Sequence, residues 1–213
     1  MKKVISINGS PRKKGNTATL LQRALDGAAS VGAEAEMVHL YDLQYKGCTS
    51  CFSCKRVDEK HWCKCAMKDE LSPVLERIMK ADAVILGSPI YFGDVTGEMR
   101  SFMERMEFMN YSYDTGASNF KGRINVGEIF TMNVTTDMMN QMKLNLVFDS
   151  HQFLPKALNG EWEYMTANDT LQFNDYSKYA AGVFDEKHKR KVHQEQFPID
   201  CDKAFDMGKR LSM

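Results

Sequence analysis

The strongest constraint on the fold lies near the start of the chain, where an apolar run gives way to a polar loop and then to a helical pattern. Residues 4–7 are mostly apolar, residues 8–11 (Asn-Gly-Ser-Pro) break the run, and helical spacing begins at Thr17. A buried strand that leads into a helix N-terminus makes an anion site, because the free N–H groups of the first turn and the helix dipole both favour negative charge. The segment therefore predicts a cradle for the phosphate of a nucleotide or a flavin.

The side chains of this loop fit the same purpose. Ser10, Asn16 and Thr17 can add hydrogen-bond donors, and Arg12 can add positive charge. The loop is not Gly-x-Gly-x-x-Gly, and no Gly-Lys-Ser/Thr follows it, so a Rossmann dinucleotide site and a P-loop nucleotidase are both disfavoured. Taken alone, a Ser-Pro turn followed by a threonine cap explains the stretch equally well.

The rest of the chain alternates between strand and helix patterns. The predicted strands are residues 4–7, 35–40, 83–86, 123–132 and 162–173. The predicted helices are residues 17–31, 72–80, 97–109, a stretch from 137 to about 154, 184–196 and 200–211. This order indicates an open, doubly wound α/β sheet with right-handed parallel crossovers, in which ligands bind beyond the carboxyl ends of the strands.

Three polar loops follow predicted strands, at residues 8–17, 88–96 and 133–137. The second contains Tyr91 and Phe92 between small residues. A flat heterocycle is bound by such a loop, because backbone N–H groups meet its polar edge and apolar side chains meet its face. The alternative is a strand-to-helix turn whose aromatic side chains belong to the core.

Together the first two loops resemble the flavodoxin-like NAD(P)H-dependent FMN reductase superfamily, and within it the branch of the iron–sulfur flavoproteins. The resemblance is carried by Asn8-Gly9-Ser10-Pro11-Arg12, Gly15-Asn16-Thr17, Gly87-Ser88-Pro89-Ile90-Tyr91-Phe92-Gly93 and Gly97-Glu98-Met99-Arg100. It implies one flavodoxin-like FMN-binding domain over residues 1–213, with a three-layer, five-stranded parallel sheet of order 2-1-3-4-5. A cysteine-rich loop at 47–68 and a helical extension at about 184–213 complete the expected domain.

The resemblance also implies roles for individual residues. The FMN phosphate is expected to bind Ser10, Arg12, Asn16 and Thr17, and the isoalloxazine ring is expected to lie against Pro89, Ile90, Tyr91, Phe92 and Gly93. The implied enzyme is an FMN-dependent oxidoreductase that takes hydride from NAD(P)H and passes electrons to a small-molecule or protein acceptor. No dedicated acid–base residue is expected, and Tyr91 is expected to lie near the ring. The resemblance also implies a homodimer or tetramer.

Cysteines are concentrated in one segment, since five of the six lie between Cys48 and Cys65. Outside a secretory context, such a cluster indicates metal, iron–sulfur or redox chemistry. The run Cys48-x-x-Cys51-x-x-Cys54 resembles the one that iron–sulfur flavoproteins use for a [4Fe–4S] cluster, where neighbouring thiolates must converge. Cys63 or Cys65 would be the fourth ligand, after a longer gap than the family pattern has.

Other interpretations of this segment stay open. Cys65-x-x-x-Asp69-Glu70 resembles a pattern in relatives that need no cluster. Zinc could be bound by Cys48, Cys51, Cys63 and Cys65, or by His61. The thiols could also be free. A cluster would favour a second function, an iron–sulfur flavoprotein that shuttles electrons between FMN, the cluster and a ferredoxin-like partner. A third alternative is a non-enzymatic module that binds another phosphate ligand.

Charge and hydropathy narrow the kinds of binding partner and the location that we expect. Lys plus Arg and Asp plus Glu both number 28, so the net charge is zero and gives no indication of nucleic acid or a bilayer as partner. No apolar run approaches the roughly 20 residues of a membrane span, so a cytoplasmic location is expected. His39, His151, His188 and His193 show no partner pattern. The basic run at 187–191 is expected to be a solvated helix face.

Overall fold

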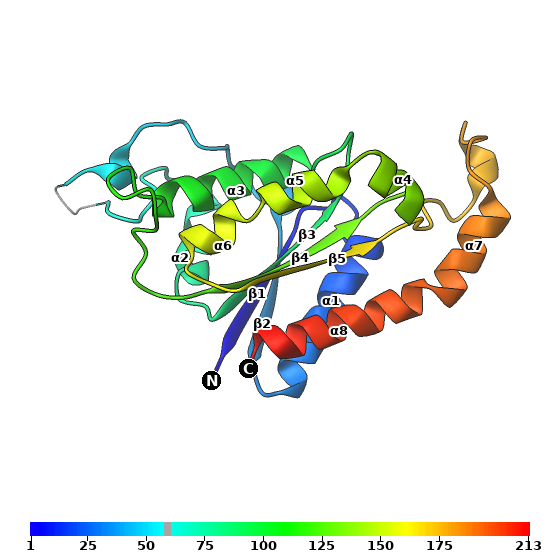
Figure 1. The fold of residues 1–213 in the computed structure, drawn as a ribbon, viewed down its shortest axis with the longest axis horizontal. Helices are drawn as coiled ribbons and strands as arrows, with labels where there is room; N and C mark the ends of the chain where they lie inside the picture. Colours follow the sequence, from blue (N-terminus) through cyan, green and yellow to red (C-terminus); the bar gives the residue numbers. More distant parts are fainter. Residues whose placement is uncertain (58–60) are drawn as a thin grey trace.

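The computed structural model describes residues 1–57 and 61–213, and these form a parallel sheet covered by helices on both faces (Figure 1). The strand order is β2-β1-β3-β4-β5, which confirms the predicted three-layer, doubly wound flavodoxin-like fold of order 2-1-3-4-5. The strands are β1 (Lys3–Asn8), β2 (Glu34–His39), β3 (Ala83–Pro89), β4 (Asn125–Thr131) and β5 (Trp162–Ala167). The helices are α1 (Asn16–Ser30), α2 (Ser72–Ile78), α3 (Gly97–Asn110), α4 (Thr136–Gln141), α5 (Leu144–Ser150), α6 (Phe153–Ala157), α7 (Glu186–Glu195) and α8 (Phe197–Leu211).

Two separate cores lie on the two faces of the sheet. One packs α1 and α8 against the strands and includes Leu20, Leu21 and Met207. The other packs α2, α3, α5 and α6 and includes Phe102 and Phe148. Because both faces are covered, the strands can be apolar throughout rather than alternating, as the sequence of β3 shows.

The two helices on the first face cross in unusually close contact. A Cβ atom at Gly208 would lie 1.7 Å from the carbonyl oxygen of Ala24, and one at Gly27 would lie 1.9 Å from that of Phe205. Backbone therefore meets backbone where α1 and α8 cross, and only glycine allows this approach at these two positions.

The predicted long helix ending near residue 154 is wrong in its continuity. The segment forms three short helices, and Lys143 between α4 and α5 has a left-handed φ of 56°. This break turns Leu144 and Phe148 toward the sheet, where the Phe148 ring stacks on Phe130 with centroids 4.2 Å apart. Core packing therefore overrides the helical periodicity of the sequence.

Two predicted strand ends also differ from the structure. β3 continues beyond residue 86 to Pro89, because Ser88 and Pro89 pair with β4. β5 stops at Ala167 and does not reach residue 173 as predicted. Asp169 has a φ of 55°, which redirects the chain into an irregular segment over the sheet edge.

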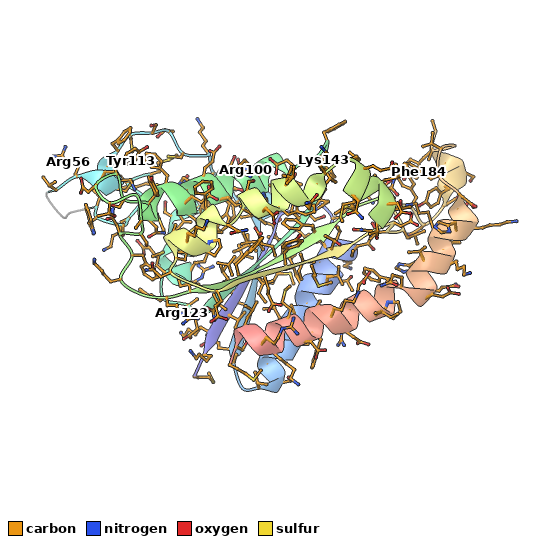
Figure 2. All side chains as sticks on the ribbon, in the orientation of Figure 1. Arg56, Arg100, Tyr113, Arg123, Lys143 and Phe184 are labelled. Carbon is orange, nitrogen blue, oxygen red and sulfur yellow. The ribbon has the colours of Figure 1, made fainter. Side chains whose placement is uncertain are left out.

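The cysteine-containing loop and α7 lie at opposite ends of the molecule, whereas α8 of the predicted helical extension packs on α1 as part of the core (Figure 1). The cysteine-containing loop lies near the C-terminus of α3, with Tyr113 and Arg56 close by, whereas Phe184 marks the far end beside α7 (Figure 2). The predicted loop at 47–68 includes residues 58–60, which are outside the described part of the chain. Within residues 1–57 and 61–213, every helix is too short or too polar to cross a membrane.

Candidate functional site

A cleft of about 960 Å³ opens at the carboxyl edge of the sheet. All three predicted loops contribute to it, and so does a fourth segment that follows β5. Its lining includes Ser10, Arg12, Asn16, Thr17, Pro89, Ile90, Tyr91, Thr131, Asn133, residues 170–175, Lys178, Tyr179, His193 and Phe197. The structure thus gathers seven of the nine predicted site residues around one cavity.

The floor of the cradle is formed by two nearly buried hydroxyl residues. Thr17 is 2% exposed and its Oγ1 lies 2.8 Å from Oγ1 of Thr131, while the Ser10 hydroxyl accepts a hydrogen bond from the Arg12 N–H at 3.2 Å. Among the described residues, no side chain caps the N-terminus of α1, and its first turn has no acidic residue. The helix N-terminus therefore presents its free N–H groups to the cleft.

The two longer side chains of the cradle reach across the cleft to the fourth segment. Arg12 Nη1 donates to the carbonyl of Gln172 at 2.7 Å, and Asn16 Nδ2 donates to the carbonyl of Leu171 at 2.9 Å. The Arg12 guanidinium also lies over the Phe173 ring, 5.9 Å from its centroid. A phosphate bound here would compete with these carbonyl oxygens for the same donors.

The loop at residues 88–96, here called the aromatic loop, forms a tight turn at the cleft. Tyr91 and Asp94 exchange backbone hydrogen bonds of 2.8 and 3.2 Å, and between them Phe92 and Gly93 have φ values of 53° and 99°. Two left-handed residues at these positions define a type I′ turn. Pro89, Ile90 and Tyr91 line the cleft, whereas Phe92 and Gly93 do not, and the Phe92 side chain is fully exposed.

A left-handed phenylalanine costs about 1–2 kcal/mol relative to ordinary backbone conformations. The Phe92 side chain recovers none of this through burial. The type I′ turn therefore keeps Phe92 in a left-handed conformation that no packing of its side chain offsets.

The fourth wall of the cleft was not predicted from the sequence. Phe173 and Tyr179 stack with centroids 4.1 Å apart, and His193 stacks on Phe197 at 5.1 Å. Apolar alternation past residue 167 favoured a longer strand, and nothing in the local sequence distinguishes a wall of a cleft from a strand. His193 lies on α7 and Phe197 on α8, both within the predicted helical extension at about 184–213.

Two of the residues that line the cleft carry a polar atom without a hydrogen bond from the described residues. Asn133 Oδ1 and His193 Nδ1 are buried, and neither has a hydrogen-bond partner in the described part of the protein. Buried polar atoms are normally paired, because an unpaired one loses its hydration without compensation. A ligand with several hydroxyl or phosphate groups would satisfy them, which fits a phosphorylated, polyhydroxylated cofactor such as FMN.

Four of the clustered cysteines line a second, much smaller cavity. Cys48, Cys51, Cys54 and Cys65 line it, and Cys63 does not. Burial raises the pKa of Cys54, whereas hydrogen bonds to Ser53 lower the pKa of the exposed Cys51. Within the described residues, no group of three or more His, Cys, Asp or Glu side chains is arranged to hold a metal ion.

A buried arginine secures both ends of the cysteine loop. Arg105 Nη1 donates to the Asp69 carboxylate at 2.7 Å and to the Lys46 carbonyl at 3.1 Å. Burial would raise the pKa of Asp69, but hydrogen bonds from Arg105 and Ser72 outweigh this effect and lower it. The loop is therefore anchored to α3 at its two ends, with the four thiols between them.

The chain matches one described protein family. The sequence profile of the NADPH-dependent FMN reductases matches residues 2–128, which is more than half of the 213 residues. Solved structures share the fold as well. A NAD(P)H:quinone oxidoreductase from Methanothermobacter marburgensis has a TM-score of 0.72 at 13% identity, with 100% of this chain and 98% of that chain covered. An FMN-dependent NADH-azoreductase from Bacillus anthracis in complex with FMN has a TM-score of 0.63 at 11% identity, with both chains covered fully, at 100%.

Sequence relatives point in the same direction. An iron–sulfur flavoprotein of Archaeoglobus fulgidus is 40% identical over 103 residues, which are 48% of each chain. One from Methanocaldococcus jannaschii is 40% identical over 103 residues, covering 48% of this chain and 51% of that protein. The chain thus spans about half the length of these relatives. One from Methanosarcina thermophila is 25% identical over 157 residues, covering 71% of this chain and 80% of that protein. On the family profile, this chain belongs to the NADPH-dependent FMN reductase family.

Proposed function

We propose that this protein is an FMN-dependent oxidoreductase that takes hydride from NAD(P)H. One observation carries the proposal: the uncapped N-terminus of α1 and the Pro89–Tyr91 stretch line the same cleft. In this proposal the phosphate lies over the first turn of α1, and the ring lies along the Pro89–Tyr91 stretch. FMN, when bound, supplies the hydride and electron chemistry.

The residues of the chain then bind FMN and fix its orientation. Ser10 and Thr17 hold the phosphate from below, and Arg12 exchanges its contact with the Gln172 carbonyl for one with the phosphate. Asn133 and His193 are suited to the polar groups between phosphate and ring. Tyr91 is about half exposed at the cleft, and we propose that it lies next to the incoming nicotinamide.

The relatives and neighbours support this assignment by the names they carry. They include an NADH-azoreductase in complex with FMN and a NAD(P)H:quinone oxidoreductase. The electron acceptor is accordingly proposed to be a small organic oxidant or a redox protein.

Self-association is proposed for the face beside the aromatic loop. Large apolar side chains are exposed at Phe92 in the turn, at Met142 and Leu146 in and beside α5, and at Phe153 at the start of α6. Gly93 lies against Leu144, so this face continues from the turn onto α5. Exposed large apolar side chains are typical of interfaces, which supports a homodimer or tetramer.

The central assignment is tested by a flavin-binding titration. The Ser10→Ala, Thr17→Ala double variant is expected to lose FMN, because two hydroxyl donors to the phosphate are removed. Ser30→Ala, at the other end of α1, is the matched control, since its hydroxyl donates to the Gly27 carbonyl of the same helix, away from the cleft. Full flavin occupancy in the double variant would refute the phosphate assignment.

We also propose a second function, an iron–sulfur flavoprotein, on the strength of one observation. Cys48, Cys51, Cys54 and Cys65 line one cavity, and four thiolates are the usual donor set of a [4Fe–4S] cluster. The relatives from Archaeoglobus fulgidus, Methanocaldococcus jannaschii and Methanosarcina thermophila are iron–sulfur flavoproteins by name. If iron is bound, electrons could pass to a ferredoxin-like partner at the cysteine-bearing end of the molecule.

This second function is tested on protein purified without oxygen. Iron and acid-labile sulfide are measured together with flavin in the wild type, Cys54→Ser and Cys63→Ser. Stoichiometric iron and sulfide that Cys54→Ser loses and Cys63→Ser keeps would support the four-thiol cluster. Flavin without iron or sulfide would leave the nicotinamide-dependent reductase as the only function proposed.

A further inference from the structure

We infer that His151 is a positioning residue that holds the ring-binding turn in place through Arg100 and Asp94. The inference rests on the proposed FMN function, because the turn matters only if it meets a flavin. It concerns a histidine for which the sequence showed no partner. In the structure this side chain is completely buried and connected on both sides.

The ends of the aromatic loop are secured independently of the histidine. The Thr96 N–H donates to the Ser88 hydroxyl at 3.0 Å, and the Thr96 hydroxyl donates to the Gly9 carbonyl at 2.7 Å. These bonds hold the two sides of the loop at the sheet. They leave the tip, with the exposed Tyr91 and Phe92, to be held from elsewhere.

Asp94 is the residue through which the tip meets the body of the protein. It closes the turn through its backbone bonds to Tyr91, and its carboxylate accepts the Val95 N–H at 2.7 Å. The same carboxylate oxygen lies 3.7 Å from Arg100 Nη2 and 3.6 Å from His151 Nε2. A cationic group next to this carboxylate therefore fixes the end of the turn.

Behind these groups lies a buried carboxylate on β4. His151 Nδ1 is 3.0 Å from Glu128 Oε1, and the Trp162 indole donates to Glu128 Oε2 at 2.9 Å. A carboxylate can only accept, so the imidazole donates from Nδ1. In the neutral ring Nε2 is then the acceptor for Arg100 Nη2, which lies 3.1 Å away.

These contacts form a continuous series from the core to the turn. Glu128 orients His151, His151 accepts a hydrogen bond from Arg100, and Arg100 faces Asp94. Arg100 lies on α3, in the helical layer that covers this face of the sheet (Figure 2). Glu107 also faces this group from α3, and burial raises its pKa to about 7, so it adds little negative charge in acid. A buried His–Glu pair is costly unless it is satisfied on every side. Here Trp162 and His151 satisfy Glu128, Arg100 satisfies His151, and Asp94 is the carboxylate that Arg100 faces.

The inference is tested by comparing FMN with riboflavin, which has the ring but no phosphate. Asp94→Asn loses the charged contact with Arg100, and His151→Gln loses the imidazole that orients Arg100. Each variant is expected to bind both ligands about tenfold more weakly, because the turn is no longer held in place. The visible circular dichroism of bound flavin is expected to change in both variants. Asp149→Asn, an exposed carboxylate two residues from His151, is the matched control and should match the wild type.

The two proposals fail in different ways. If the wild type binds neither FMN nor riboflavin, the proposed function is overturned and the positioning role with it. If the wild type binds both, but Asp94→Asn and His151→Gln keep its affinity and its visible dichroism, only the positioning role is overturned. His151→Gln alters a buried residue and could fail to fold. Asp94 is about half exposed, so Asp94→Asn then still tests the contact without disturbing the core.

Discussion

The ammonium group of Lys189 lies buried against the carboxylate of Asp169, at the point where the chain leaves β5. Lys189 also donates to the Asn133 carbonyl at 2.6 Å, and His188 Nε2 lies 2.6 Å from the other Asp169 oxygen. The predicted solvated helix face at 187–191 is therefore wrong for Lys189, whose side chain is only 4% exposed. This contact ties α7 to the edge of the sheet where the cleft opens.

Replacement of this lysine should destabilise the protein strongly. Lys189→Met keeps the length of the side chain but leaves Asp169 with a buried, poorly compensated charge. We expect the free energy of unfolding to fall by about 3–5 kcal/mol in chemical denaturation. Lys191→Met on the same helix is the control, because its exposed pair with Glu195, at 3.9 Å, should contribute less than about 1 kcal/mol. Equal effects of the two substitutions would contradict the anchoring role.

Arg12 and Lys13 offer a test of the phosphate cradle with adjacent residues. Arg12 lines the cleft, whereas Lys13 is paired with Asp42 at 2.6 Å, outside it. Arg12→Ala should weaken FMN binding by about tenfold or more, because a charge-assisted bond to phosphate is lost. Riboflavin binding should not change. Lys13→Ala should leave both affinities within about twofold, and a similar loss in the two variants would point to general electrostatic attraction rather than a specific contact.

Glu107 should make stability depend on pH around neutrality. Burial raises its pKa to about 7 in the folded protein, from an ordinary value of 4.5. Between these values the folded state binds more protons than the unfolded state, so the free energy of unfolding decreases as pH rises. The decrease should reach up to about 3 kcal/mol above pH 7.

Glu107→Gln removes this effect and provides the measurement. The variant should match the wild type near pH 5 and exceed its stability near pH 8 in chemical denaturation. Glu76→Gln, exposed on α2, should follow the wild type at both pH values. If the free energies of unfolding of Glu107→Gln and the wild type differed by the same amount at both pH values, the carboxyl group would not titrate in this range.

The crossing of α1 and α8 should not tolerate a methyl group. Gly208→Ala gains helix propensity of about 1 kcal/mol, yet its Cβ would overlap the Ala24 carbonyl. Because the overlap is with backbone, no rotamer relieves it, and we expect a net loss of about 2 kcal/mol or more in thermal or chemical unfolding. Gly182→Ala has open space around its Cβ position and should change stability by less than about 0.5 kcal/mol. Unchanged stability of Gly208→Ala would mean that the helices can separate without cost.

Some features of this protein follow from local sequence alone. The strand at residues 4–7, the helix that begins near Thr17 and the apolar strand from residue 83 are each encoded within a few residues, through burial pattern and turn chemistry. Their alternating order is enough to predict a doubly wound sheet, and the carboxyl-edge rule then brings Ser10, Arg12 and Tyr91 to one cleft.

The remaining features depend on contacts between residues that are far apart in the chain. The break at Lys143 is decided by the packing of Phe148 on Phe130, and the early end of β5 is accompanied by the bond between Asp169 and Lys189. His151 meets Glu128 from 23 residues away. The local sequence does not contain this information, because a buried charge is tolerated only when its partner arrives from another element. Local patterns thus specify the sheet and the loop at residues 8–17, whereas contacts between distant elements select the charged and aromatic side chains that enclose the cleft.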